Sequence, residues 1–294
     1  PAVKDAIMHS EQSPIVVFAV AMFICGLFIK GGIIPFHAWV PDAYMAAPYP
    51  VSVLLAGIVT KVCGIYTLIR LVVLVFGFVP GINNILLAAG AVSLVFGGIA
   101  ALGQSDLRRM LAYSSISQMG FILLGLGSAV ELGMIGAVFH FFNHTVFKTL
   151  LFVNSTAIGL RAGTTKIEEL ERLSYKMPVT AFTSVIAFLS AGGVPPLAGF
   201  WSKLIIIIAL WSSGKYIYAA IAAFSSVITI AYFLLMQRKI FFSKSKQGPE
   251  YVTEINLGFS VLSVILAVIA IGAGILFPYV YNLLFRPVGA IFYL

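Results

Sequence analysis

Long apolar segments alternate with short polar segments along most of the chain. A helix that spans a bilayer needs about 20 mostly apolar residues, and its backbone groups must be hydrogen-bonded within the segment. The pattern therefore predicts an all-α polytopic membrane protein with about eight transmembrane helices. The candidate segments lie near residues 14–34, 52–76, 84–102, 109–128, 132–159, 178–212, 216–240 and 256–285. The alternating pattern of a transmembrane β-barrel is absent from the sequence.

Two of these segments contain helix-breaking residues. The first runs into Gly31-Gly32-Ile33-Ile34-Pro35, and the sixth carries Gly192-Gly193-Val194-Pro195-Pro196 in its middle. Because proline breaks a helix interior, both segments are predicted to be discontinuous helices. Interrupted helices at corresponding places in two halves of a transporter indicate the transport site. The alternative is an ordinary helix–loop–helix pair at each place.

The composition excludes a soluble fold. The chain has 294 residues, of which 61% are hydrophobic and 10% charged, with a mean hydropathy of +1.06. A soluble domain is about one quarter charged residues. The two cysteines, Cys25 and Cys63, lie in apolar segments and form no metal-ligand or disulfide pattern. No redox-cofactor motif is found, so we expect no cofactor and no metal in this chain.

The net charge of +8 reflects the placement of basic residues on the two sides of the membrane. Basic residues are concentrated in alternate loops, and the richer side of a membrane protein faces the cytoplasm. These residues are Arg108, Arg109, Arg161, Lys166, Arg172, Lys176, Arg238, Lys239, Lys244 and Lys246, against Arg70, Lys215 and Arg286 on the other side. We therefore expect a multi-pass protein of a prokaryotic cell membrane, with no nucleic-acid partner. The stretch 164–176, which alternates in charge sign, predicts a short surface helix.

Once the basic residues assigned to loops are set aside, six ionisable groups remain inside the apolar segments, without a carboxylate among them. They are Lys30, Lys61, His140, His144, Lys148 and Lys203. A lysine near the bilayer centre costs at least about 2.5 kcal/mol, so such groups should face the protein interior or water. His140, His144 and Lys148 recur every four residues and therefore share one helical face, over about 12 Å. We interpret the six groups as a proton relay.

Other readings of these residues stay open. The polar groups of the histidine-bearing helix could hold neighbouring helices together. Two histidines four residues apart can bind zinc, but no Cys, Asp or Glu accompanies them in the segment. Lys30, Lys61 or Lys203 could instead extend its ammonium group to a membrane interface.

At these residues the sequence resembles a known family. The motifs are Lys30-Gly-Gly-Ile-Ile-Pro35-Phe-His37-Ala-Trp39-Val-Pro41-Asp42, Leu55-Ala-Gly57-Ile-Val-Thr-Lys61, Asp106-Leu-Arg108-Arg109-Met-Leu-Ala-Tyr113-Ser114-Ser115-Ile-Ser117-Gln118-Met-Gly120, His144-Thr-Val-Phe-Lys148, and Gly193-Val-Pro195-Pro196-Leu-Ala-Gly199-Phe200-Trp-Ser-Lys203. The chain is similar to the antiporter-like membrane subunits of the complex I superfamily. That superfamily includes NADH–quinone oxidoreductase, Mrp-type sodium/proton antiporters and membrane-bound hydrogenases.

The resemblance implies two inverted repeats, each with one broken helix. It places Lys30 and Lys61 in the first repeat, His140, His144 and Lys148 on the central axis of the second, and Lys203 at its end. The implied parts are residues 1–76, the last two helices of the first repeat; residues 77–242, the second repeat; and residues 243–294, a C-terminal transmembrane helix. The family's earlier helices and their glutamate have no counterpart here, since Glu11 does not match that motif. We therefore expect the chain to be N-terminally incomplete.

The expected function is proton translocation, with Na+/H+ exchange as a variant, in a redox-driven respiratory or hydrogenase-type complex. The expected partners are other membrane subunits of that complex, the lipid bilayer and H+ or Na+. Whether the chain counts as an enzyme stays open, because the redox centre would lie in another subunit of such an oxidoreductase. The alternatives are a quinone-binding subunit, a structural subunit that passes no ions, and a stand-alone secondary transporter.

Overall fold

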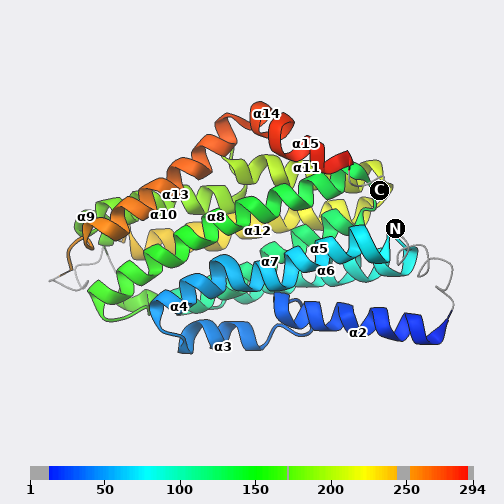
Figure 1. The fold of residues 1–294 in the computed structure, drawn as a ribbon. Helices are drawn as coiled ribbons and strands as arrows, with labels where there is room; N and C mark the ends of the chain where they lie inside the picture. The colour runs from blue at the N-terminus through cyan, green and yellow to red at the C-terminus, as the bar shows by residue number, and fades with distance from the viewer. Residues whose placement is uncertain (1–12, 171, 244–251, 291–294) are drawn as a thin grey trace.

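All eight predicted membrane segments are helical in the computed structural model, which describes residues 13–170, 172–243 and 252–290. The long helices lie roughly side by side in one bundle (Figure 1). They are α2 (Pro14–Gly31), α6 (Pro80–Leu102), α7 (Leu107–Gly127), α8 (Glu131–Ala162), α12 (Tyr216–Ile240) and α13 (Leu257–Ile275). Extended pairing in the described residues is limited to an isolated bridge between Asp106 and Lys166. The prediction of an all-α membrane protein is confirmed.

Both predicted breaks are present. α2 ends at Gly31, the chain turns through Gly32 at a φ of 67°, and α3 (Trp39–Ala46) follows roughly in line with α2 (Figure 1). α10 (Pro178–Gly192) ends in the same way at Gly193, where φ is 82°, before α11 (Ala198–Ser212) begins. Glycine is required at both turns because a side chain is strained in the left-handed region.

One span contains a helix type that the sequence did not predict. α4 (Tyr49–Leu54) continues into η1 (Leu55–Tyr66), a π-helix of 12 residues that carries Lys61, and then into α5 (Thr67–Leu71) and η2 (Val72–Phe76). π-Helices are rare and occur mostly as single-turn bulges at functional sites. η1 packs against the end of α2 so closely that a Cβ on Gly64 would lie 2.5 Å from the Gly31 nitrogen.

Two sequence predictions differ from the structure. The last segment is not one helix over 256–285, because α13 ends at Ile275. The short helices α14 (Phe277–Val280), η4 (Tyr281–Phe285) and α15 (Arg286–Ala290) then turn back over the bundle (Figure 1). Pro278 lacks the N–H group that a continuous helix would need. The stretch 164–176 holds two short turns, η3 (Ile167–Glu169) and α9 (Leu173–Lys176), because Arg172 has a left-handed φ of 56°. Residue 171, like Lys244 and Lys246, lies outside the described residues.

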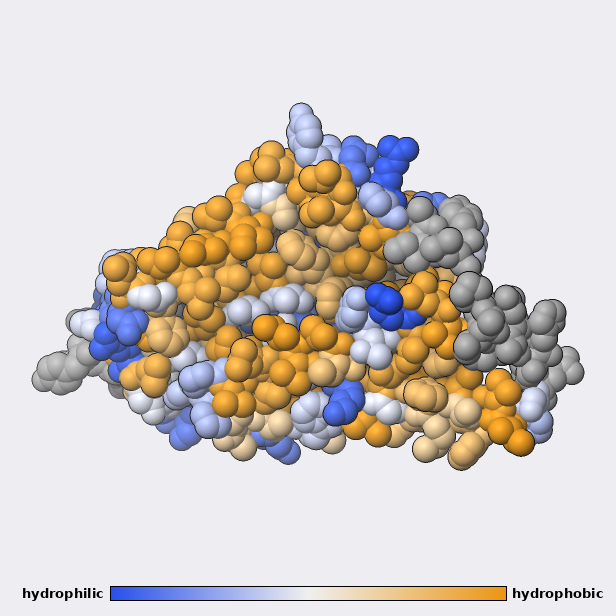
Figure 2. Space-filling view, in the orientation of Figure 1, coloured by the Kyte–Doolittle hydropathy of each residue, from blue (hydrophilic) through white to orange (hydrophobic). Residues whose placement is uncertain are grey.

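The core of the bundle is built around α7 and α8. Nearly all of α7 is buried, and close contacts at Gly97 and Gly120 bring it against α6. α2 and α13 are mostly exposed, as expected for helices that face lipid. Figure 2 shows hydrophobic residues over most of one face of the molecule, with hydrophilic residues at its left end, along its lower edge and at its top. The protein is therefore an integral, multi-pass membrane protein.

Arg108 is a structural residue rather than a loop charge that only sets orientation. It lies in the first turn of α7 and is 8% exposed. Its Nη2 donates hydrogen bonds to the carbonyl oxygens of Tyr44 and Ala47 and to the hydroxyl of Ser52, and its guanidinium carbon lies 4.8 Å from the centre of the Tyr49 ring. The guanidinium therefore holds the connection between α3 and α4 against α7.

Arg108→Ala should destabilise the protein, by about 2 kcal/mol, because buried acceptors lose a charged donor. Arg109→Ala is the matched control. The Arg109 side chain is 43% exposed and lies 3.6 Å from the exposed Asp42 carboxylate, an ion pair whose loss should cost at most about 1 kcal/mol. Thermal unfolding of both variants in detergent measures the difference. Equal losses would contradict the structural role of Arg108.

Candidate functional site

Five of the six predicted relay residues lie together in the protein interior. Three structural elements supply them: η1, α8 and α11. Lys61, His140, His144 and Lys148 are fully buried, and Lys203 is 3% exposed. We call these five residues the basic column.

The centre of the basic column is one face of α8. The rings of His140 and His144 are stacked, with centroids 6.3 Å apart and planes inclined by 9°. Phe121 and Phe147 pack on them, at 5.3 Å from the His140 and His144 rings respectively. The four-residue spacing thus gives the shared face that the sequence predicted, and fully buried aromatic rings pack on it.

Lys148 lies on α8, and its side chain is hydrogen-bonded to the neighbouring helix α7. Its Nζ donates to the carbonyl oxygen of Leu111 at 3.0 Å and to the hydroxyl of Ser114. The ammonium group also lies 5.8 Å from the centre of the Phe233 ring. Of the two ion pairs found among the described residues, neither involves Lys148. A buried cation held only by neutral acceptors can release its proton without leaving an unpaired carboxylate.

Lys203 occupies the second helix break. Its Nζ donates to the carbonyl oxygen of Ala191 at 2.7 Å and to that of Gly192 at 3.4 Å. These carbonyls belong to the last turn of α10, which has no further helical N–H groups to bind and forms the negative end of the helix dipole. The break therefore creates the site at which the Lys203 cation is stabilised.

The neighbouring Ser202 connects α11 to the histidines. The Oγ of Ser202 lies 2.9 Å from Nδ1 of His140. One turn away on α8, Nδ2 of Asn143 donates to the carbonyl oxygen of Ala198 at 2.9 Å. The first turn of α11 is thus fixed to the face of α8 that carries the basic column.

Several atoms of the basic column have no protein partner. Among the described residues, Nζ of Lys61, both ring nitrogens of His144 and Nε2 of His140 are buried without a hydrogen bond to protein. Buried polar groups are normally satisfied, and exceptions mark catalytic groups or sites of internal water. Titratable groups joined through water can pass a proton from one to the next.

Lys30 is not brought into this arrangement. It lies in the last turn of α2 and is exposed. The residue that follows it, Gly31, packs on Gly64 of η1, one turn after Lys61. Lys30 is therefore next to the element that carries Lys61, but its side chain lies at the surface.

The polar partners on α7 and α11 could not be assigned a role from the sequence. A usable signal exists for Ser114, because Ser114, Ser115, Ser117 and Gln118 interrupt an otherwise apolar span. Polar residues clustered in a buried span indicate interhelical hydrogen bonds. Ser202 carries no such signal, since its role depends on where the second break places it.

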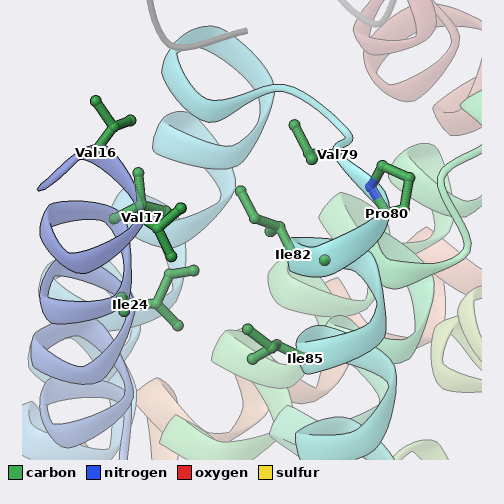
Figure 3. A pocket seen from close by; sticks show the side chains of 10 residues that line it. Val16, Val17, Ile24, Val79, Pro80, Ile82 and Ile85 are labelled. Atoms are coloured by element: carbon green, nitrogen blue, oxygen red, sulfur yellow. The ribbon is translucent and has the colours of Figure 1, made fainter. Parts of the chain in front are cut away.

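A groove between α2 and α6 lies apart from the basic column. It encloses about 440 Å³ and is lined by aliphatic residues such as Val17, Ile24 and Ile82 (Figure 3). Within the described part of the chain, no three His, Cys, Asp or Glu side chains gather where they could hold a metal ion.

The fold and the motifs together define the class of protein. Interrupted helices and ionisable groups inside membrane spans mark ion and substrate pathways in membrane proteins. Residues 2–229 match the family described as NADH:quinone oxidoreductase/Mrp antiporter, transmembrane. The chain belongs to this family, as the motifs indicated.

Named relatives come from two kinds of complex. The chain is 36% identical over 225 residues to an NADH-quinone oxidoreductase subunit of Desulforudis audaxviator, which covers 76% of this chain and 45% of the relative. It is 32% identical over 265 residues to a Na(+)/H(+) antiporter subunit of Alkalihalophilus pseudofirmus. That match covers 90% of this chain and 52% of the relative. The chain thus spans about half the length of these relatives.

Solved structures share the fold. A chain of the membrane-bound sulfane sulfur reductase, an archaeal respiratory membrane complex, superposes with a TM-score of 0.85 at 32% identity, over 96% of this chain and 48% of that one. A chain of respiratory complex I from Thermus thermophilus gives a TM-score of 0.79 at 26% identity. This superposition covers 92% of the present chain and 57% of that one.

Proposed function

We propose that the chain conducts protons across the membrane as part of a multi-subunit complex, with Na+/H+ exchange as the variant. The observation that carries this proposal is the basic column, in which five ionisable groups from three elements are buried and no carboxylate of the described residues pairs with them. Burying so many basic groups destabilises the fold, so a purely structural role would leave them unexplained.

The proposed route follows the basic column. A proton moves from Lys148 to His144 and His140, and then through the hydroxyl of Ser202 to Lys203. Water bridges the steps at which no direct hydrogen bond exists. Because charges repel strongly in an apolar interior, a second positive charge in the column drives the first one onward. Lys61 acts on His144 in this way from η1.

The driving energy comes from other subunits in this proposal. Relatives are named as subunits of an NADH-quinone oxidoreductase and of a Na(+)/H(+) antiporter. Lys30, exposed at the end of α2, is the group that we place at the contact with the rest of the complex. A change in its surroundings would reach Lys61 through the contact of Gly31 with Gly64.

Lys203→Ala tests the proposal in the assembled complex, reconstituted in vesicles. We expect the protons moved per redox turnover to fall roughly tenfold, because the terminal group of the relay is lost while water keeps part of the path. A pH-sensitive dye inside the vesicles and the rate of the redox reaction are recorded together. Lys239→Ala removes an exposed lysine at the end of α12 and should leave both unchanged.

Other outcomes would assign other functions. Unchanged proton movement at unchanged turnover in Lys203→Ala would leave the chain as a structural subunit. Labelling of this chain by a photoreactive quinone analogue would favour a quinone site. Uptake of a labelled anion by the chain alone in vesicles would favour a stand-alone transporter.

A further inference from the structure

Arg70 is a charged residue on the outer surface of a membrane span, and not a loop residue as predicted from the sequence. It lies in α5, six residues before the span ends at Phe76, and it is exposed. Leu71 and the five residues of η2 follow it before the span ends, so its backbone lies inside the span. Charged groups at such depth mark functional sites, and their partners should be identified.

The described residues give Arg70 one hydrogen-bonding partner. Its Nη1 donates to the hydroxyl of Tyr66 at 3.1 Å, and its guanidinium carbon lies 5.9 Å from the centre of the same ring. The two ion pairs found in residues 13–170, 172–243 and 252–290 do not include it. A guanidinium has five N–H donors, so most of those of Arg70 remain available to an anion.

A groove begins beside this guanidinium. It encloses about 450 Å³ between the span that carries Arg70 and the first half of α8. Apart from Arg70 and Tyr66, its walls are apolar: Ile69, Val73, Leu74, Met134, Val138, Phe141 and Val288. Figure 2 shows a hydrophilic patch over α5 within the hydrophobic face of the molecule. The groove is thus apolar along its length and cationic at one place.

The α2–α6 groove provides a contrast. It has nearly the same volume, 440 Å³, but none of the described residues that line it is charged (Figure 3). Apolar walls alone do not identify an occupant. The groove beside Arg70 differs because its cation selects the charge of the molecule that fills it.

We propose that this groove binds an anionic glycerophospholipid. The phosphate accepts hydrogen bonds from Arg70 and from the Tyr66 hydroxyl, and one acyl chain lies along the apolar walls. The planar guanidinium matches the oxygens of a phosphate, with which it forms strong charge-assisted hydrogen bonds. From inside the span the long Arg70 side chain extends its guanidinium toward the interface, where the phosphates of anionic lipids lie, and basic pockets between transmembrane helices recognise such headgroups. The site is separate from proton conduction and does not depend on it.

The experiment uses the complex that contains this chain, purified in mild detergent. Native mass spectrometry measures the binding of phosphatidylglycerol and of phosphatidylcholine with the same acyl chains. The unmodified complex should prefer phosphatidylglycerol, and Arg70→Gln should weaken that binding about tenfold, as expected for the loss of a charge-assisted contact. Arg161→Gln, at an exposed arginine in the last turn of α8, is the matched control and should leave the preference unchanged.

Two further measurements separate the lipid from other occupants. Leu74→Trp fills the groove while Arg70 is kept, and it should weaken the binding of phosphatidylglycerol as well. Inorganic phosphate at millimolar concentration should not displace the lipid, and displacement would indicate a free-anion site instead. If Arg70→Gln and Arg161→Gln bind phosphatidylglycerol equally, or if Leu74→Trp has no effect, the proposal is wrong.

Discussion

Lys148→Ala is expected to abolish proton translocation by the complex. The proposed route starts at Lys148, whose Nζ is held by α7, so the variant removes the group that delivers protons to the two histidines of α8. We expect at least about a 100-fold fall in protons moved per redox turnover, the size typical for loss of a proton-transferring side chain. The measurement is the pH gradient in vesicles, recorded together with redox turnover.

Two further variants test whether proton release by Lys148 causes the expected loss. Lys148→Arg keeps a cation at the same place, but a guanidinium does not release its proton in a protein, so we expect the same loss as in Lys148→Ala. Leu150→Ala removes a fully buried side chain from the same helix. It should cost about 3 kcal/mol of stability while translocation per assembled complex is kept. A Lys148→Arg variant that still pumps would show that the positive charge, and not proton exchange, is what matters.

The membrane spans could be predicted from the sequence because one strong signal controls them. In lipid, length and hydrophobicity decide which segments are helical, and no tertiary contact is needed to recognise them. The two breaks could be predicted for a similar reason. Gly32 and Gly193 are each followed within three residues by a proline, and this combination ends a helix. The local sequence was therefore sufficient to predict both the membrane spans and the two helix breaks.

The π-helical turns of η1 could not be predicted in this way. Their geometry coincides with two close approaches: a Cβ on Gly57 would lie 2.5 Å from the Thr149 hydroxyl, and one on Gly64 would lie 2.5 Å from the Gly31 nitrogen. Both neighbours are distant in sequence. A pattern of apolar residues shows that the segment spans the membrane, but it does not show how the backbone fits its partners.

The candidate site was predicted only in part for the same reason. Charged residues inside apolar segments were visible as exceptions, which identified the groups of the basic column. The sequence could not show which way each side chain faces, so Lys30 and Lys61 looked alike although one is exposed and the other is fully buried. It also gave Arg108 the same status as Arg109, because a difference in burial depends on the position of the α3–α4 connection.

Gly199→Ala should disrupt the second helix break and the site of Lys203 together. A Cβ at Gly199 would overlap the carbonyl oxygen of Ser190 and lie 2.8 Å from its carbonyl carbon. Because the obstacle is backbone, the last turn of α10 must shift, and that turn supplies the Ala191 carbonyl that binds Lys203. We expect a loss of about 3 kcal/mol, at the upper end for overpacking, and a lowered transition temperature in detergent.

Gly272→Ala is the matched control for this prediction. Gly272 lies in α13, and no heavy atom comes within 4 Å of a Cβ built on it. Alanine is a better helix former than glycine, so this variant should be unchanged or more stable by up to about 1 kcal/mol.

In the fraction of Gly199→Ala that still assembles, protons moved per turnover should fall as in Lys203→Ala, because the same carbonyl site is lost. If Gly199→Ala unfolds at the temperature of Gly272→Ala and pumps normally, then α10 and α11 can separate at little cost, and the break is not what holds Lys203 in place.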